Sequence, residues 1–342
     1  MTTTAPGSGS DAVTIGTPPP FDPELAATLD VVRERMPATL TEDMLPMLTS
    51  GRAEATGPSD GELSRNGAFT VSERWVPGPA GAPEISLLIC SPAKAQAPVP
   101  AIYFAHGGGM IMGTNRGQGL AGVLEVAADL GCAVISVEYR LAPDNPHPAP
   151  VEDCYAGLLW TAEHVDELGI DPARLIVSGT SAGGGLAAAT VLLARDRGGP
   201  PIIAQALWSP MLDDRNNSYS ARQMAGLGIW DASYNGIAWR ALLGNAQGGP
   251  DVSPYAAPAR AADLSGLPPA FINVGSAETF RDEAVDYAAR IWRAGGNAEL
   301  HVWPGGFHGF EVLAPQAAIS ESARAAAAGW LRRVVGVRGG TR

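Results

Sequence analysis

A serine stands between two glycines directly after an apolar run, which is a setting for a reactive hydroxyl group. The run 175–178 (Leu-Ile-Val-Ser) leads into 179–183 (Gly-Thr-Ser-Ala-Gly) and then into a stretch of small residues. A Gly-x-Ser-x-Gly turn between a strand and a helix lifts the serine hydroxyl above the sheet edge, and glycine lets the backbone crowd there. Ser181 is therefore the candidate nucleophile. An ordinary strand-to-helix turn stays open as the alternative, because 42 of the 342 residues are glycine.

A glycine tetrad offers the donors that such a serine needs. The residues His-Gly-Gly-Gly at 106–109 follow an apolar run at 101–105. An attacked carbonyl develops negative charge on its oxygen, and backbone N–H groups stabilise that oxyanion. The sequence therefore predicts an oxyanion hole made by Gly107, Gly108 and Ala182. We expect a structural role for the histidine of the tetrad, and a flexible glycine turn is the alternative for the whole motif.

The base that activates the serine is expected to be a histidine. His308 lies in a glycine-bearing loop, 304–310, after the last expected strand, which places it at the catalytic edge of a parallel sheet. We therefore predict that His308 is the base. A packing or surface role is expected for the other four histidines of the chain. They are His106, His147, His164 and His301.

An acidic side chain must orient the imidazole. In triads with the chain order Ser, then Asp or Glu, then His, the acid follows the penultimate strand, and Glu278 stands at that point. Asp282 and Glu283 are rivals, although both fall at the start of the next expected helix, where a carboxylate stabilises the helix dipole. Asp213 and Asp214 follow the preceding strand and are more simply explained as polar loop residues. Glu278 is the predicted acid.

Composition limits the classes of function. The chain has 23 basic and 35 acidic residues and a formal net charge of −12, so nucleic acid and anionic membrane surfaces are not expected partners. The first 20 residues lack the basic start and apolar core of a secretion signal, and no apolar run reaches membrane-spanning length. We expect a cytoplasmic protein. Three widely spaced cysteines predict neither a disulfide framework nor a metal site; they are Cys90, Cys132 and Cys154.

Strands and helices are expected to alternate, which is typical of an α/β protein with a mostly parallel sheet covered by helices. Hydrophobic runs predict strands at 70–76, 85–90, 101–105, 133–137, 175–178, 204–208, 270–274 and 299–303. Apolar residues at helical spacing predict helices at 22–35, 41–48, 118–130, 151–168, 182–197, 282–294 and 319–335. The first two strands are separated by Pro-Gly-Pro at 77–79, which favours an antiparallel hairpin at the start of the sheet.

Three segments of the chain are distinguished by composition. Residues 1–20 are expected to form a flexible tail, 21–66 a set of N-terminal cap helices, and 67–342 the catalytic α/β domain. Residues 213–264 interrupt the alternation after a strand, a position over the ligand crevice of an α/β sheet, so they are predicted to be a lid insertion with helical part 219–243. Side chains of the two cap segments, 21–66 and 213–264, are candidates to line a pocket, with ordinary packing as the alternative: Met44, Met47, Met224, Trp230 and Trp239.

These motifs together resemble those of the bacterial hormone-sensitive-lipase-like carboxylesterases, a family with the α/β-hydrolase fold. The resemblance extends from about residue 85 to about residue 335. The segments that carry it are 106–109 (His-Gly-Gly-Gly), 137–143 (Val-Glu-Tyr-Arg-Leu-Ala-Pro), 151–153 (Val-Glu-Asp), 179–184 (Gly-Thr-Ser-Ala-Gly-Gly) and 307–310 (Phe-His-Gly-Phe).

The resemblance implies hydrolysis of small esters, with short acyl chains preferred, through an acyl-enzyme on Ser181. It also implies no cofactor, no metal, a helical cap, and frequent dimerisation through the sheet edge, so a second copy of the chain is one candidate partner. A lactonase, amidase or arylformamidase would share the same triad, and a non-catalytic ligand-binding relative would share the pocket. Both alternatives stay open.

Three residues depart from the common family pattern. Thr180 stands where many members have aspartate, as in a Gly-Thr-Ser-Ala-Gly branch of the family, and Met110 stands where an aromatic residue often follows the glycines. Glu278 stands where most members have aspartate as the triad acid. The longer glutamate reaches the imidazole if its backbone lies slightly further back.

Overall fold

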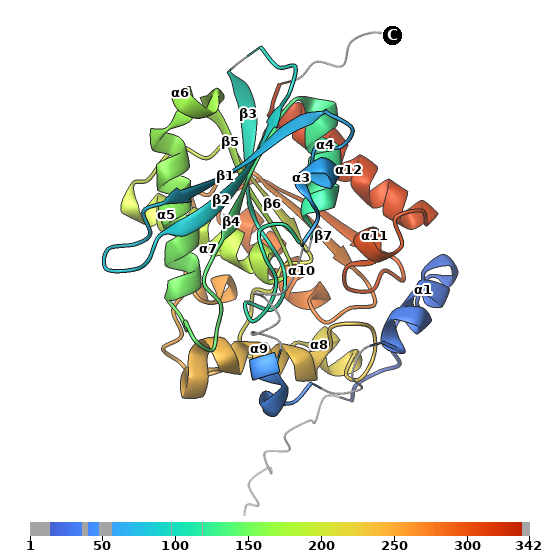
Figure 1. Ribbon diagram of the computed structural model, residues 1–342. Helices are drawn as coiled ribbons and strands as arrows, with labels where there is room; N and C mark the ends of the chain where they lie inside the picture. Colours follow the sequence, from blue (N-terminus) through green and yellow to red (C-terminus); the bar gives the residue numbers. More distant parts are fainter. Residues whose placement is uncertain (1–13, 36–39, 48–56, 97, 118, 337–342) are drawn as a thin grey trace, which may run out of the picture.

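Eight strands form one sheet in this computed structural model, which describes residues 14–35, 40–47, 57–96, 98–117 and 119–336 (Figure 1). The strands are β1 (Phe69–Val76), β2 (Ile85–Pro92), β3 (Val99–Ala105), β4 (Ala133–Glu138), β5 (Ile170–Thr180), β6 (Ala204–Trp208), β7 (Ala270–Gly275) and β8 (Ala298–Trp303). The α-helices are α1 (Pro23–Arg33), α3 (Asp60–Leu63), α4 (Leu120–Leu130), α5 (Ala149–Glu163), α6 (Val165–Leu168), α7 (Ala182–Arg197), α8 (Tyr219–Gln223), α9 (Ala232–Leu243), α10 (Arg281–Arg293), α11 (Phe310–Leu313) and α12 (Ala318–Val334). Short 3₁₀ helices are η1 (Glu42–Met44), η2 (Gly244–Ala246) and η3 (Pro258–Arg260).

The sheet is mostly parallel, as the alternation of strands and helices predicts. Its order is β1-β2-β4-β3-β5-β6-β7-β8, with β1 antiparallel to β2 and β2 antiparallel to β4. The remaining neighbours in this order, β4-β3-β5-β6-β7-β8, all pair in parallel. Because parallel strands end at one edge of a sheet, the loops after β3, β5, β7 and β8 all open on the same side.

Helices cover both faces of the sheet and bury its apolar side chains. Helices α5, α7 and α10 pack on one face, and α4 and α12 pack on the other. The α7 helix is rich in alanine and glycine, so it can approach its neighbours closely. A Cβ atom on Gly185 would lie 2.1 Å from the Met211 carbonyl oxygen, which is why only glycine fits there. The central helix therefore lies tightly against the residues that follow β6.

The loops at the carboxyl edge are covered by α8 and α9, with α1 beside them (Figure 1). Helix α1 packs on the loop after β8 and on α11, because Leu25 and Leu29 share an apolar cluster with Phe307 and Phe310. The Asp22 amide also donates a hydrogen bond of 3.0 Å to the Gly305 carbonyl. Helix α3 packs elsewhere, on the α4 face.

Some element boundaries differ from those expected. The segment 151–168 was expected to be one helix, but α5 ends and α6 begins around His164, where φ is −115° and ψ is 27°. The helix expected at 118–130 begins at Leu120, since Gly119 has a φ of 100° and acts as its N-cap. Residues 118 and 48, and residues 1–13 of the expected tail, lie outside the described residues.

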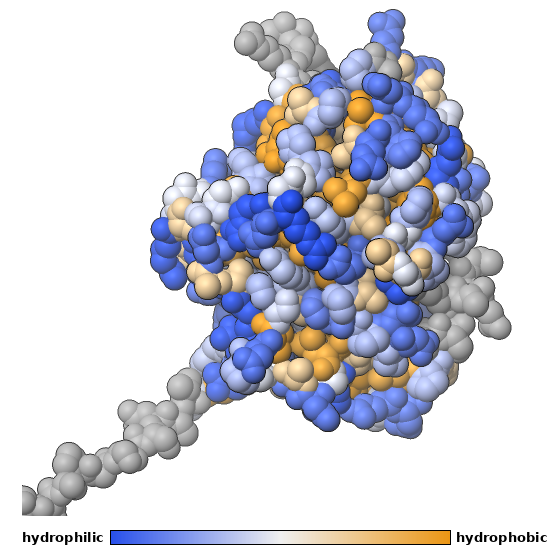
Figure 2. Space-filling model, turned by 90° about the vertical axis from the view of Figure 1, so that its left-hand side faces the viewer, coloured by the Kyte–Doolittle hydropathy of each residue, from blue (hydrophilic) through white to orange (hydrophobic). Residues whose placement is uncertain are grey.

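The surface is mainly hydrophilic on the face seen in Figure 2, with apolar patches in both its upper and its lower part. Among the described residues, no helix is both long enough and apolar enough to span a bilayer.

Candidate active site

Ser181 lies at a sharp turn between β5 and α7. Its φ of 56° and ψ of −122° fall in a region that residues other than glycine rarely adopt. The turn is held by two hydrogen bonds, from the Ser181 amide to the Trp208 carbonyl (2.7 Å) and from the Met211 amide to the Ser181 carbonyl (3.0 Å). This strained geometry is the one a nucleophile elbow requires, because it raises the side chain above the sheet.

The glycines beside Ser181 are required by close backbone contacts. A Cβ atom on Gly179 would lie 2.0 Å from the Gly183 carbonyl oxygen, and one on Gly183 would lie 2.1 Å from the Ala105 carbonyl oxygen. No side chain fits at such distances. The Gly-x-Ser-x-Gly motif therefore has a packing reason as well as a conformational one.

His308 lies in the loop between β8 and α11 and meets Ser181 across the sheet edge. Its Nε2 is 2.9 Å from Ser181 Oγ, within hydrogen-bond distance. The Phe280 ring stands edge-on to the imidazole, with centroids 5.1 Å apart, and holds its plane. The His308 side chain is 13% exposed, so a ligand can still reach it.

Glu278 lies on the other side of the imidazole. Its Oε1 is 3.1 Å from His308 Nδ1. Its Oε2 accepts hydrogen bonds from the Ser209 hydroxyl (2.9 Å) and from the Gly275 amide (3.0 Å). With the Glu278 side chain fully buried, these donors fix the carboxylate. We assign the Nδ1–H tautomer from this network, in which His308 donates to Glu278 and accepts from Ser181.

The loops that carry Glu278 and His308 are joined to each other. The Ala277 amide donates to the Gly306 carbonyl (3.0 Å), and the Gly305 amide donates to Ser276 Oγ (2.8 Å). A Cβ atom on Gly275 would lie 2.1 Å from the same Gly306 oxygen. The relative position of acid and base is therefore set by the backbone of two adjacent strands.

The rival acidic residues have other partners. Asp282 accepts from the Ser220 amide (2.7 Å) and pairs with Arg281. The Glu283 carboxyl accepts from the Leu212 amide (2.7 Å). Asp213 pairs with Arg215 (2.6 Å), and the buried Asp214 pairs with Arg260 (2.7 Å). Of these carboxylates, the structure brings only Glu278 to the imidazole of His308.

The remaining histidines have other surroundings. His106 is buried, stacks on Tyr139 with centroids 4.1 Å apart, and has its Nδ1 2.7 Å from the Gly107 oxygen. His164 stacks on Trp160, and His301 stacks on Trp303. His147 lies in the loop before α5, where burial lowers the pKa of its imidazole.

The glycine tetrad lies against the serine. The Cβ position of Gly107 is 3.4 Å from Ser181 Cβ. Gly108 has a φ of 113°, and its carbonyl accepts from the amides of Ile111 and Met112, at 3.0 Å each. Ala182 is the first residue of α7, where an amide has no acceptor within its own helix. The tetrad and the first residue of α7 are therefore both neighbours of Ser181.

One residue of the insertion closes over the tetrad. A Cβ atom on Gly109 would lie 2.6 Å from the Trp230 ring, so the indole rests directly on the glycine backbone. The Trp230 carbonyl in turn accepts from Thr279 Oγ1 (2.7 Å), next to Glu278. The insertion is thereby anchored to both sides of the site. Of the other pocket candidates, Met224 and Trp239 are fully buried, while Met47 is exposed.

Two further buried carboxyls lie near Glu278. Burial raises the pKa of Glu283 well above its usual value, and the charges of Asp213 and Glu278 act in the same direction. Burial also raises the pKa of Glu311 to about 7, again with Glu278 contributing. In both side chains, burial therefore disfavours the charged form relative to an exposed glutamate.

Sequence reasoning did not identify several of these partners. Ser209 donates to Glu278 from the residue after β6, and its position at a strand's carboxyl end was the available signal. Glu311 carries no such signal, because it stands inside a short helix. Among the described residues, no cluster of three or more His, Cys, Asp or Glu side chains is arranged to hold a metal ion.

Comparison with known proteins gives consistent matches over most of the chain. A family described as having the alpha/beta hydrolase fold matches residues 102–312. Carboxylesterase NlhH of Mycobacterium tuberculosis (strain ATCC 25618 / H37Rv) is 36% identical over 260 residues, covering 72% of this chain and 78% of that protein. Esterase LipI of the same strain is 34% identical over 284 residues, covering 83% of this chain and 85% of that protein.

A solved structure is also similar to this chain. A bacterial heroin esterase is 40% identical with a TM-score of 0.81, and the match covers 92% of this chain and 98% of that one. The likeness therefore includes the sheet, its covering helices and most of the chain length on both sides.

Proposed function

The chain belongs to the α/β-hydrolase family, within its hormone-sensitive-lipase-like carboxylesterases, and from this premise we propose a mechanism on Ser181, His308 and Glu278. The proposed reaction is hydrolysis of a small carboxylic ester through an acyl-enzyme. The observation that supports it is the continuous contact from Ser181 Oγ through the His308 ring to Glu278 Oε1, at 2.9 Å and 3.1 Å.

In the first half-reaction, His308 Nε2 takes the Ser181 proton while Oγ attacks the ester carbonyl carbon. The carbonyl oxygen becomes an oxyanion, and the amides of Gly107, Gly108 and Ala182 donate hydrogen bonds to it. The C–O bond to the alcohol then breaks, and the proton on Nε2 passes to the leaving alkoxide oxygen. The products of this half are a free alcohol and an ester of Ser181.

In the second half-reaction, water takes the place of the alcohol. His308 Nε2 accepts a proton from that water as its oxygen attacks the acyl carbon, and the same amides stabilise the second oxyanion. Collapse releases the carboxylic acid and returns the proton to Ser181. In both half-reactions, the buried Glu278 carboxylate accepts a hydrogen bond from His308 Nδ1–H. This hydrogen bond keeps the imidazole oriented and stabilises its positive charge.

Active-site labelling separates this proposal from a ligand-binding role without turnover. A p-nitrophenyl phosphonate should add one phosphonyl group to wild-type protein and none to Ser181→Ala, because only an activated serine displaces p-nitrophenolate. Release of p-nitrophenol from short esters should be lost in the same variant. Absence of labelling in the wild-type protein would favour the binding role.

We propose a preference for short acyl chains, supported by the closeness of the insertion to the site. The Trp230 ring on Gly109 limits the space above the oxyanion loop. A panel of p-nitrophenyl esters from acetate to palmitate tests this preference, and faster turnover of the long esters would contradict it. Lactones, amides and an aryl formamide in the same panel test the related reactions that share the triad.

The cap and the oligomeric state are part of the same proposal. We infer that α1, η1 and residues 213–264 form the cap. Helix α1 packs on the loop that carries His308, and Trp230 of the insertion packs on the glycine tetrad at 106–109. Strand β8 is an edge strand of the sheet, and its Val302 side chain is 38% exposed. Both features support a homodimer that forms through this edge. Light scattering after size-exclusion chromatography measures the mass, and a Val302→Lys variant should shift a dimer toward monomer.

A further inference from the structure

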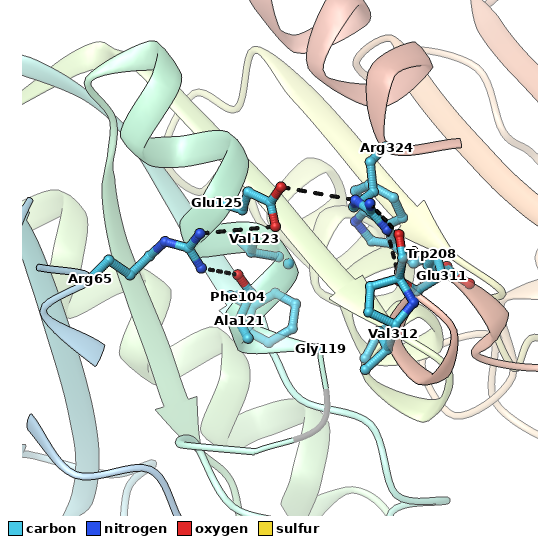
Figure 3. A pocket seen from close by; sticks show the side chains of 13 residues that line it. Arg65, Phe104, Gly119, Ala121, Val123, Glu125, Trp208, Glu311, Val312 and Arg324 are labelled. Carbon is cyan, nitrogen blue, oxygen red and sulfur yellow. Dashed lines mark hydrogen bonds and ion pairs between the residues drawn. The ribbon is translucent and has the colours of Figure 1, made fainter. Parts of the chain in front are cut away.

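A cavity of about 240 Å³ lies next to the proposed catalytic residues, on the sheet face covered by α4 and α12 (Figure 3). Its walls are mainly apolar and include Phe104, Val123, Trp208, Val312 and Pro315. The volume is just below the range of about 300–1,000 Å³ typical of sites for drug-sized ligands. The cavity therefore suits a small group, such as one arm of an ester.

The cavity is bounded by residues adjacent to the reacting ones. Thr180, which lines it, immediately precedes Ser181 in the chain. Trp208 lines it as well, and the Trp208 carbonyl accepts the Ser181 amide at 2.7 Å. Val312 belongs to α11, which begins two residues after His308. The cavity thus lies beside the nucleophile and the base, although neither side chain forms its wall.

Thr180 lies between the cavity and the oxyanion loop. Its methyl carbon Cγ2 is 3.2 Å from the Cβ position of Gly107 and 2.6 Å from that of Gly119. Gly107 belongs to the proposed oxyanion hole, while Gly119 is another residue of the cavity wall. The Thr180 side chain therefore lies against both the glycine tetrad and the cavity wall.

Glu311 is a buried polar group in the wall of this mainly apolar cavity. It lines the cavity, is only 7% exposed, and its Oε2 has no hydrogen-bond partner among the described residues. Its Oε1 has one distant donor, Asn273 Nδ2, at 3.4 Å. A buried carboxyl oxygen without a partner is unfavourable, so a ligand that supplies a hydrogen bond there gains affinity.

The charges at the mouth restrict the chemistry of that ligand. Arg65 and Arg324 lie on opposite sides of Glu125, at 3.9 Å and 4.0 Å from its carboxylate (Figure 3). Arg324 also donates to the main-chain carbonyls of Glu311 (3.1 Å) and Pro315 (2.6 Å), so its guanidinium is occupied by the backbone. Arg65 and Arg324 oppose entry of a cation, and Glu125 opposes entry of an anion. A neutral polar group fits best.

We propose that this cavity receives the part of the ester that carries a free hydroxyl group, and that the Glu311 carboxyl binds that hydroxyl. The inference rests on the esterase activity proposed above. A hydroxyl can donate to a carboxylate and accept from a carboxylic acid, so it serves Glu311 in either protonation state. The substrate class is thus a short ester of a hydroxy acid or of a diol.

Isosteric pairs of esters test the proposal and distinguish the acyl side from the alcohol side. On the acyl side, p-nitrophenyl β-hydroxybutyrate is compared with p-nitrophenyl isovalerate, in which a methyl group replaces the hydroxyl. On the alcohol side, the primary monoacetate of propylene glycol is compared with isobutyl acetate. We expect one of the two pairs to favour the hydroxylated ester by about tenfold or more in kcat/KM.

Variants assign this preference to Glu311. Glu311→Met keeps the length of the side chain and removes its polar atoms, so the preference should disappear while hydrolysis of the plain ester continues. Glu311→Gln keeps an acceptor and should retain the preference. Glu125→Gln, which removes one negative charge at the mouth, is the matched control and should also retain it.

The outcomes separate this inference from the proposed function. If the plain esters are hydrolysed and neither pair shows a preference in the wild-type protein, the inference is overturned and the esterase proposal stands. The wild-type comparison decides this point even if Glu311→Met fails to fold. A preference that survives in folded Glu311→Met also overturns the inference. If no ester is hydrolysed, the proposed function itself fails.

Discussion

Ser181 Oγ and His308 Nε2 lie 2.9 Å apart although 127 residues separate them in the chain. The two residues follow β5 and β8, which are separated in the sheet by β6 and β7. The loop after β8 must therefore fold back along the sheet edge to reach the serine. Glycines at 305 and 306 form that bend, and α1 packs against it. The contact depends on the whole carboxyl edge rather than on one motif.

Replacing Ser181 with alanine should abolish turnover while leaving the fold intact. Members of a triad act as one unit, so we expect kcat on p-nitrophenyl butyrate to fall by about four orders of magnitude or more. Initial rates at equal protein concentration, set by absorbance, measure this loss. The variant should keep about the wild-type melting temperature, because alanine retains the Cβ atom and the backbone geometry at a φ of 56° and loses only the hydroxyl group. Near-normal hydrolysis would refute the mechanism.

The pair Glu278→Gln and Asp282→Asn tests the identity of the acid. Glu278→Gln should lower kcat by about 10³–10⁴, because the amide selects the wrong imidazole tautomer. Asp282→Asn should change kcat only a few-fold, because its carboxylate accepts the Ser220 amide at the start of α8 and does not contact His308. A steady-state comparison at one pH is sufficient. The opposite ranking would move the acid to Asp282.

Local patterns were enough to predict the parts of the site that sit at strand ends. Ser181 and the glycine tetrad each follow an apolar run, and such runs predicted the sheet that the structure contains. The carboxylate that meets His308 is the one expected from its place after β7. The prediction of the sheet is confirmed, and the proposed site residues lie together in it because a parallel sheet places all its carboxyl ends on one edge.

Features that depend on long-range packing could not be predicted. The hydrogen bond from Ser209 to Glu278 spans 69 residues, and the cluster of Leu25 with Phe310 joins the two ends of the chain. No period in the sequence encodes these contacts, because each depends on how separate elements meet.

Leu25→Ala should weaken the loop that holds His308. Leu25 is fully buried in the cluster that joins α1 to Phe307 and Phe310, and a cavity there costs about 2–5 kcal/mol. We expect a lower melting temperature and a steeper loss of activity on mild heating than in the wild-type protein. Val31→Ala on the exposed side of the same helix is the control, with Val31 49% exposed. Equal behaviour of the two variants would argue against this bracing role of α1.

Glu311 should make the protein less stable as the pH rises from about 4.5 to about 7. Burial raises its pKa from 4.5 to about 7, so between these values the folded protein holds a proton that the unfolded chain has released. The folded state binds more protons, and stability therefore falls with increasing pH in this window. Glu311→Gln should remove this pH dependence, which amounts to about 3 kcal/mol in the free energy of unfolding. Urea unfolding at pH 4.5, 6 and 8 measures the difference, which should grow with pH and then level off. A constant difference would contradict the raised pKa.

The contact between Gly109 and Trp230 can be tested with a double-mutant cycle. Gly109→Ala places a methyl group 2.6 Å from the Trp230 ring at a residue with a φ of 62°, so it adds both a clash and backbone strain. We expect kcat/KM for short esters to fall about tenfold or more, because the tetrad carries the proposed oxyanion donors. Trp230→Ala alone should raise the turnover of longer acyl esters by opening the space above the tetrad.

In the double variant the clash disappears and the strain remains, so activity should recover only in part, giving a coupling of about 1 kcal/mol or more. Additive effects of the two substitutions would show that the indole does not press on the oxyanion loop.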